Sequence, residues 1–205
     1  MGLDFKALES SEKEGNYSLD VITKNSDNLP AGDLLVKVEY SSLNYKDAMS
    51  ATGIPGVTKE YPHTPGIDAV GEVVETKVNR LKKGDKVIVT GYDLGMNTSG
   101  GFAEYIRVPE SWVIPLPGGL STIDSMSLGT AGLTAGLSIL ALDEFRGLKG
   151  ASAVVSGSTG GVGSIAVMLL SQLGATVTAI SGKDEMDFLR SIGAKEVFSR
   201  EELQD

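Results

Sequence analysis

The sequence predicts an α/β protein in which a β-rich N-terminal part is followed by a parallel, doubly wound sheet. Short apolar runs separated by turn residues fill the first 120 residues. From Gly150 onward, strand-length and helix-length segments alternate instead. A glycine-rich stretch, SGSTGGVGS over 156–164, lies between the first of these strands and the first of these helices.

The N-terminal part contains seven runs typical of β-strands. They are FKALE, LDVIT, LLVKVEYSS, AVGEVVET, DKVIVTGY, FAEYIRVP and WVIPLP, with turn sequences such as LPAGD, KKGDK and TSGG between them. A helix capped by Ser121 or Thr122 is expected next, running through IDSMSLGTAGLTAGLSILAL. We therefore predict a boundary near Leu120, with one domain over 1–120 and a second over 121–205.

The C-terminal part has a βαβαβ pattern. Strands are expected at SAVVSG, TVTAI and KEVFS, and the two intervening helices are expected to end at Gly174 and Gly193. Connections of helix length join parallel strands. A dinucleotide-binding fold needs two such halves, and one is found here, so we expect the chain to be a fragment.

Composition excludes several classes of partner. The chain has 205 residues with 18 Lys and Arg against 27 Asp and Glu, a formal net charge of -9, so nucleic acid is an unfavourable partner. It has no cysteine, and hence neither disulfides nor thiolate metal sites. The start resembles no signal peptide, and the apolar runs are shorter than a membrane span. We expect a cytoplasmic protein without a membrane partner.

The glycine-rich stretch predicts a phosphate-binding turn, because a strand precedes it and a helix begins on it. Aligned to G-x-G-x-x-G, it starts at Ser158, which replaces the first glycine, while Gly163 would let the helix pack on the strand. A second register, G-x-x-x-G-x-G, resembles short-chain dehydrogenases, but no Y-x-x-x-K pair follows it. A tight turn without a ligand is the alternative. The predicted cofactor contacts are Ser158, Thr159, Gly160, Gly161 and Val162.

The end of the second expected strand indicates which cofactor binds. An acid at this position would accept hydrogen bonds from the ribose of NAD, whereas the residues present are Ser181, Gly182 and Lys183. Lys183, together with Arg200 beyond the third strand, would suit the 2′-phosphate of NADPH. The sequence therefore predicts NADPH. Ordinary solvated charge is the alternative for both cations.

Several motifs in a fixed order carry a family resemblance. SSLNYKDAMSATG, PGIDAVGEVVE, KKGDKVIV, GGFAEYIRVP and GTAGLTA, ahead of the glycine turn, resemble the medium-chain dehydrogenase/reductase superfamily over nearly the whole chain. LNYKD, PGID, WVIPLP, GTAGLTA and SGSTGGVGS resemble its zinc-free branch of NADPH quinone oxidoreductases and acrylyl-CoA reductases. The resemblance implies a GroES-like N-terminal domain, a Rossmann-type sheet that is truncated here, and a homodimer. It also implies hydride transfer to a quinone or to an α,β-unsaturated acyl-CoA.

The same resemblance bears on zinc. Zinc-dependent members use a cysteine, a histidine and a cysteine at positions that are Asn44, Ile67 and Thr130 here, and none of these suits zinc. We therefore expect no metal. His63, the single histidine, is expected to be a loop or strand-edge residue without a chemical role.

The resemblance also implies which residues face the nicotinamide. Asn44 would offer an amide donor, Tyr45 a phenol for the ribose or the substrate, and Asp47 a carboxylate that orients Lys46 or Tyr45. Thr130 and Thr134 resemble family positions on the nicotinamide side. In the alternative interpretation, LNYKD only caps a short helix with Asn44 as the N-cap. A non-catalytic NADPH-binding protein is the rival function, and an RNA-binding role is disfavoured by the net charge of -9.

Overall fold

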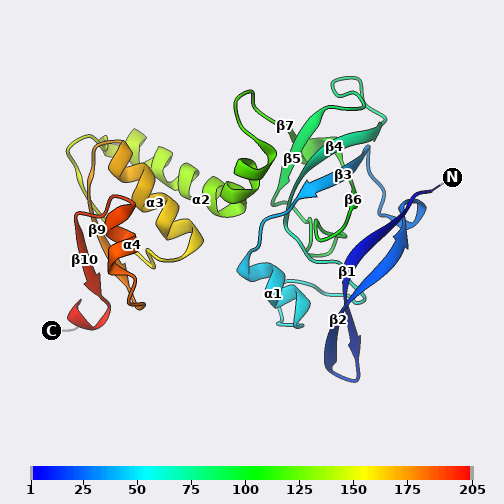
Figure 1. The fold of residues 1–205 in the computed structure, drawn as a ribbon, viewed down its shortest axis with the longest axis horizontal. Helices are drawn as coiled ribbons and strands as arrows, with labels where there is room; N and C mark the ends of the chain where they lie inside the picture. Colours follow the sequence, from blue (N-terminus) through cyan, green and yellow to red (C-terminus); the bar gives the residue numbers. More distant parts are fainter. Residues whose placement is uncertain (1, 204–205) are drawn as a thin grey trace. The chain divides into compact units, whose positions relative to one another are not determined.

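The computed structural model describes residues 2–203 and divides the chain into two compact units (Figure 1). Unit 1 is Met1–Thr130 and unit 2 is Ala131–Asp205. These units meet inside a helix, ten residues beyond the predicted domain boundary. The domain boundary near Leu120 stays a prediction, because a division into compact units does not by itself define domains.

Unit 1 consists of seven antiparallel strands, at the places where the sequence predicts them. β1 (Asp4–Lys13) and β2 (Asn16–Asn25) form a two-stranded sheet. A five-stranded sheet has the order β6-β3-β4-β5-β7. Its strands are β3 (Leu34–Tyr40), β4 (Asp68–Thr76), β5 (Lys86–Thr90), β6 (Tyr105–Val108) and β7 (Val113–Pro115). Short helical segments complete the unit: α1 (Tyr45–Ala51), η1 (Ser26–Asn28) and η2 (Glu110–Trp112).

The core of unit 1 follows the two-residue period of its strands. Val87 and Val89 of β5 are buried while the residues between and beside them are partly exposed. Leu34 and Val36 of β3 and Val73 of β4 join them in one apolar cluster. Burial of one face fixes the register, since a slip by one residue would turn these side chains to water.

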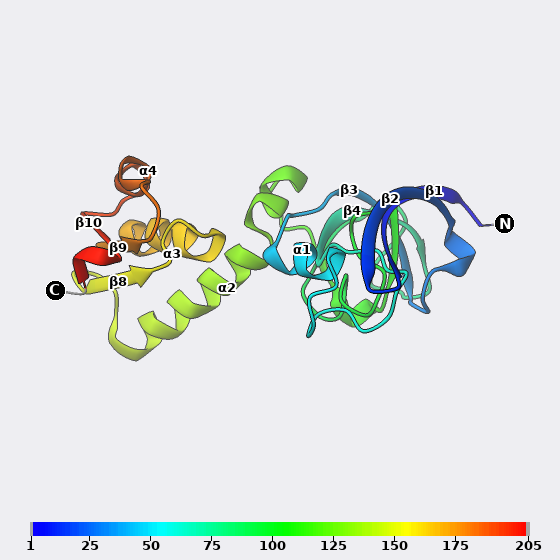
Figure 2. The ribbon, with the colours of Figure 1, turned by 90° about the horizontal axis from the view of Figure 1, so that it is seen from below.

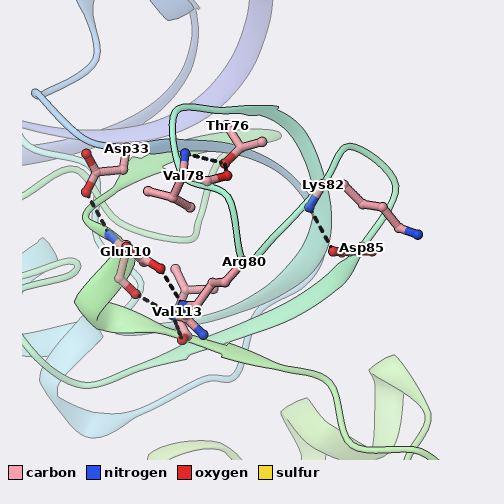
Figure 3. A network of polar contacts seen from close by, with 8 residues as sticks. All are labelled: Asp33, Thr76, Val78, Arg80, Lys82, Asp85, Glu110 and Val113. Atoms are coloured by element: carbon pink, nitrogen blue, oxygen red, sulfur yellow. Dashed lines mark hydrogen bonds and ion pairs between the residues drawn. The ribbon is translucent and has the colours of Figure 1, made fainter.

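Polar contacts tie the loops at one end of this sheet together (Figure 3). Arg80 donates to the backbone oxygens of Glu110 and Val113 at 3.0 and 3.1 Å and forms an ion pair with the Glu110 carboxylate. Asp33 accepts from the backbone N–H of Glu110 at 3.0 Å. The loop after β4 is thereby fastened to the start of β7.

Unit 2 contains a three-stranded parallel sheet of order β10-β9-β8, as the sequence predicts. The strands are β8 (Ser152–Ser156), β9 (Thr176–Ser181) and β10 (Glu196–Ser199); the helices are α3 (Gly161–Gln172) and α4 (Met186–Ser191), followed by η3 (Glu201–Leu203). In Figure 2, α3 and α4 lie on one side of β8 and α2 on the other. The order matches the first half of a Rossmann sheet, so the α/β fold class is confirmed. Gly174 and Gly193 follow the two helices with positive φ, which confirms them as helix ends.

The helix α2 (Thr122–Arg146) departs from the expected continuous helix. Ser121 caps it, accepting from the Asp124 N–H at 3.1 Å. Gly129 has φ 49° and ψ −151°, which breaks the helix into two stretches. A Cβ at Gly129 would lie 2.3 Å from the Ser42 hydroxyl oxygen and 2.8 Å from an Asp68 oxygen. The kink is therefore built by a glycine that sits directly against polar side chains.

By length and composition, α2 is also the one helix among residues 2–203 that could cross a membrane, contrary to our reading of the apolar runs. The core helix of a soluble protein passes the same test, and the kink at Gly129 interrupts this one. Several of its apolar side chains are exposed, including Leu137 and Phe145. The absence of a membrane partner remains an expectation.

Candidate functional site

The glycine turn in unit 2 leaves no room for side chains where it meets the helix. A Cβ on Gly163 would lie 2.3 Å from the carbonyl oxygen of Gly157 and 2.8 Å from the Cα of Ser158. Gly157 itself has φ 63°. The N-cap of α3 is Gly160, which has no side chain to satisfy the first N–H groups. These N–H groups and the helix dipole form a ready site for an anion such as a pyrophosphate.

Two side chains of this turn bond to the neighbouring strand instead of pointing outward. Ser158 is fully buried, and its hydroxyl donates to the Ile180 oxygen at 2.8 Å. The Thr159 hydroxyl lies 3.2 Å from the Ser181 hydroxyl. Both contacts fasten the turn to the end of β9. Ser158 thus contributes shape, while Gly161 and Val162 lie exposed at the start of α3.

The ends of β9 and β10 are held against each other through Ser181. Its hydroxyl oxygen accepts from the backbone N–H of Lys183 at 3.0 Å, and its carbonyl accepts from the N–H of Arg200 at 3.0 Å. A Cβ on Gly182 would lie 3.8 Å from the Arg200 guanidinium carbon. The residues after the two strands therefore lie side by side, as the sequence predicts for Lys183 and Arg200.

A pocket of about 590 Å³ opens at this place, lined by Ser181–Asp184 and Arg200 among others. The side chains of Lys183 and Arg200 are exposed and make no ion pair or hydrogen bond within residues 2–203. Asp184 and Glu201 line the pocket too, so its rim carries both signs of charge. The last residue of β9 is the neutral Ser181; Lys183 comes after β9 and Arg200 after β10. A phosphate monoester fits these donors better than a bare ribose hydroxyl does.

Unit 1 holds a buried polar cluster around Asp68, the first residue of β4. Asp68 is fully buried. Its Oδ2 accepts from Asn44 Nδ2 and from the Thr130 N–H, both at 2.9 Å, and its Oδ1 accepts from the Thr130 hydroxyl at 2.7 Å. Two predicted site residues from distant parts of the sequence are therefore brought together on one carboxylate.

Asp47 has different partners from those we expected. Its carboxylate accepts from the backbone N–H groups of Asn44, Gly66 and Ile67 at 2.7, 3.2 and 2.9 Å, and not from Lys46 or Tyr45. The residue is buried, and burial raises the pKa of its carboxyl, although the hydrogen bonds from Asn44 and Ile67 oppose that shift. Asp47 therefore fastens the start of α1 to the loop before β4.

Asn44 is the N-cap of α1, as the alternative interpretation of LNYKD predicts. Its half-buried side chain also donates to Asp68, so the Asn44 amide makes a hydrogen bond in addition to its position as the N-cap. Tyr45 is 80% exposed and available to a ligand. Thr134 lies on α2 four residues after Thr130, and its side chain is exposed.

Asp68 is the member that our sequence reasoning missed. It stands in PGIDAVGEVVE as a charge inside an otherwise apolar run. Charged residues are almost never fully buried without partners, so an acid at such a position signals a polar cluster. That signal was available and identifies Asp68 without any resemblance.

His63 belongs neither to the Asp68 cluster nor to the pocket at the ends of β9 and β10. Its backbone exchanges hydrogen bonds with Ser10 at 2.7 and 2.8 Å, which makes it a strand-edge residue as expected. The side chain is buried, and its Nε2 has no hydrogen-bond partner in the part of the chain that the structure describes. Among residues 2–203, no group of three or more His, Cys, Asp or Glu side chains could hold a metal ion. Ile67, at the expected position of a zinc-binding histidine, is a buried apolar residue.

An antiparallel β unit followed by a parallel sheet with a glycine-rich turn is the arrangement that the resemblance to the medium-chain dehydrogenase/reductase superfamily predicts, and comparison with known proteins confirms the resemblance. Residues 30–118 match the alcohol dehydrogenase GroES-like domain family. The chain is 43% identical over 98% of its length to the putative quinone oxidoreductase YhfP of Bacillus subtilis. It is 40% identical, again over 98%, to the acrylyl-CoA reductase AcuI of Ruegeria pomeroyi.

Solved structures agree with these relatives. The yhdH oxidoreductase of Salmonella enterica in complex with NADP matches 96% of the chain with a TM-score of 0.92 and 42% identity. Bacillus subtilis yhfP with NAD bound matches 99% of the chain with the same TM-score and identity. The chain spans 61% and 62% of those two chains, and 62% of each curated relative named above.

Proposed function

We propose that this protein is an NADPH-dependent, zinc-free oxidoreductase that delivers a hydride to a quinone or to the double bond of an α,β-unsaturated acyl-CoA. The pocket at the ends of β9 and β10 carries the proposal, because beside the glycine turn it presents Lys183 and Arg200, whose side chains have no partner within residues 2–203. Two of the most similar solved or curated proteins support it: yhdH was crystallised with NADP, and AcuI is named an acrylyl-CoA reductase.

The cofactor is assigned to unit 2 by its donor groups. The N–H groups at the start of α3 would bind the pyrophosphate, and Lys183 and Arg200 would bind the 2′-phosphate. Bound NADPH would supply the hydride. The yhfP structure contains NAD, so the absence of an acid at Ser181 is the feature that argues for NADPH in this chain.

Polarisation of the acceptor is assigned to side chains of unit 1. Without a metal, hydrogen-bond donors must stabilise the charge that develops on the acceptor oxygen. Asn44 would donate to that oxygen through its amide, and Tyr45, which is exposed, or water would give the proton to the α-carbon of an enoyl thioester. Asp47 would act by holding the start of α1, because its oxygens are occupied by backbone N–H groups.

The test uses the full product of the gene that encodes this chain. We expect it to oxidise NADPH when acrylyl-CoA or benzoquinone is added, and Asn44→Ala to lower kcat while leaving the affinity for NADPH unchanged. The exposed Asn97→Ala serves as the matched amide control. Tight NADPH binding with no turnover of either acceptor would refute the reaction and favour the non-catalytic alternative.

We further propose a homodimer in the cytoplasm, with small-molecule acceptors as its partners. The homodimer rests on the resemblance, and the net charge of -9 disfavours nucleic acid. Light scattering of the full gene product would test the oligomer, and a monomer at micromolar concentration would contradict it.

A further inference from the structure

The Asp68 carboxylate fixes which way the Asn44 amide points. The Asn44 Nδ2 donates to Asp68 Oδ2 at 2.9 Å, so the nitrogen end of the amide faces Asp68. The contact uses one of the two N–H bonds of the amide, and the proposed reaction needs the other.

The same carboxylate also binds Thr130, the residue directly after the kink at Gly129. Thr130 donates to it twice, from its backbone N–H and from its hydroxyl, at 2.9 and 2.7 Å. Gly129 allows this approach, because any Cβ there would lie 2.8 Å from Asp68 Oδ2. Three donors satisfy the buried charge, and no cation pairs with it within residues 2–203.

We propose that Asp68 is a positioning residue, which orients the Asn44 amide toward the acceptor and sets Thr130 beside it. The inference rests on the proposed function, in which Asn44 polarises the acceptor. Asp68 is fully buried and would not touch the acceptor itself. Its effect on the reaction would pass through Asn44.

Two substitutions separate position from charge. Asp68→Ala removes the acceptor for Asn44 and Thr130, and we expect kcat to fall between about tenfold and a hundredfold with an unchanged affinity for NADPH. Asp68→Asn can keep its oxygen toward Asn44 and the Thr130 N–H, while its NH₂ donates to the Thr130 hydroxyl, which can rotate to accept. We expect this variant to retain kcat within about threefold.

Ser42→Ala is the matched structural control. Ser42 donates to the Met126 oxygen at 2.6 Å, beside the same kink, and forms no hydrogen bond with Asn44 within residues 2–203. We expect its stability to fall and its kcat to stay unchanged. If Ser42→Ala and Asp68→Ala lower kcat equally at matched stability, the effect is general loosening and the proposal fails.

Asp68→Ala could fail to fold, so a second measurement covers that outcome. Asp68→Asn should fold, and any loss of kcat that it causes, up to about threefold, should disappear in the Asn44→Ala background, because the group that it orients is gone. A loss of kcat larger than about threefold that persists undiminished in the Asn44→Ala background would overturn the proposal.

A spectroscopic readout keeps this inference apart from the proposed function. In the ¹⁵N NMR spectrum, the Asn44 side-chain amide should exchange slowly with water in the unsubstituted protein and rapidly in Asp68→Ala. If the protein reduces neither acceptor but the Asn44 amide is protected, the proposed function fails while Asp68 still orients Asn44. Equal exchange of the Asn44 amide in the unsubstituted protein and in Asp68→Ala would overturn the inference. If Asp68→Ala is unfolded, Asp68→Asn takes its place. An Asn44 amide that is unprotected in both Asp68→Asn and the unsubstituted protein would then overturn the inference.

Discussion

Asp68 and Lys183 each carry a charge near one end of a β-strand, yet their surroundings differ completely. Asp68 is fully buried, and donors of its own unit engage both of its oxygens. Lys183 is exposed, and its ammonium has no partner within residues 2–203. A buried, paired charge fixes geometry, whereas an exposed, unpaired charge is available to a ligand. The contrast separates positioning residues from binding residues.

Truncation of Asp47 should have the largest effect on stability, because it removes a buried hydrogen-bond acceptor. Asp47→Ala leaves the backbone N–H groups of Asn44, Gly66 and Ile67 without their acceptor. At about 1–3 kcal/mol for each buried donor, we expect the free energy of unfolding to fall by about 3 kcal/mol or more. Urea unfolding followed by circular dichroism measures this. Asp187→Ala, an exposed acid, should change little, and equal losses in the two variants would contradict the assignment.

A side chain introduced into the glycine turn should have the next largest effect on stability. In Gly163→Ala the new Cβ would lie 2.3 Å from a backbone oxygen, so the turn must shift. We expect a loss of about 1–3 kcal/mol in unfolding free energy together with weaker NADPH binding. Gly136→Ala is the control, since nothing lies within 4 Å of its Cβ and helix propensity should make it neutral or stabilising. Unchanged stability and affinity in Gly163→Ala would show that the turn is not tight.

His63 should give a smaller, pH-dependent effect. Burial lowers the pKa of its imidazole, as does the charge of Lys24, while the Gly95 backbone, Asp93 and Glu9 oppose the shift. The unfolded state therefore binds the proton more readily, and stability should decline as pH falls below about 6.5. His63→Gln should flatten this decline in thermal unfolding curves. Because the chain has a single histidine, an identical decline in both proteins would exclude His63 as its source.

The sequence predicted the parts of the fold that depend on local periodicity. All seven N-terminal strands and the βαβαβ order were predicted, because burial of one face imposes a period that the residues display. The kink at Gly129 was not predicted, since it depends on Ser42 and Asp68, which are distant in the sequence. Local patterns carry no information about such packing.

In the candidate site too, some features could be predicted from the sequence and others depend on contacts between distant segments. Lys183 and Arg200 could be placed together because the carboxyl ends of parallel strands meet at one edge of a sheet. The partners of Asp47 could not, because three backbone N–H groups from a loop supply them. Asp68 could have been predicted as a member of a polar cluster, because it is an acidic residue within an otherwise apolar run.

The central claim is that unpaired cations after β9 and β10 recognise the 2′-phosphate of NADPH. Titration of the full gene product with NADPH and NADH, followed by nicotinamide fluorescence, tests it most directly. NADPH should bind more tightly than NADH, less so at high salt, and Lys183→Ala or Arg200→Ala should each weaken NADPH binding about tenfold or more without affecting NADH. Lys195→Ala, an exposed cation at the other end of β10, should change neither affinity. Equal affinity for both nucleotides, or NADPH binding unaffected by either pocket substitution, would contradict the account.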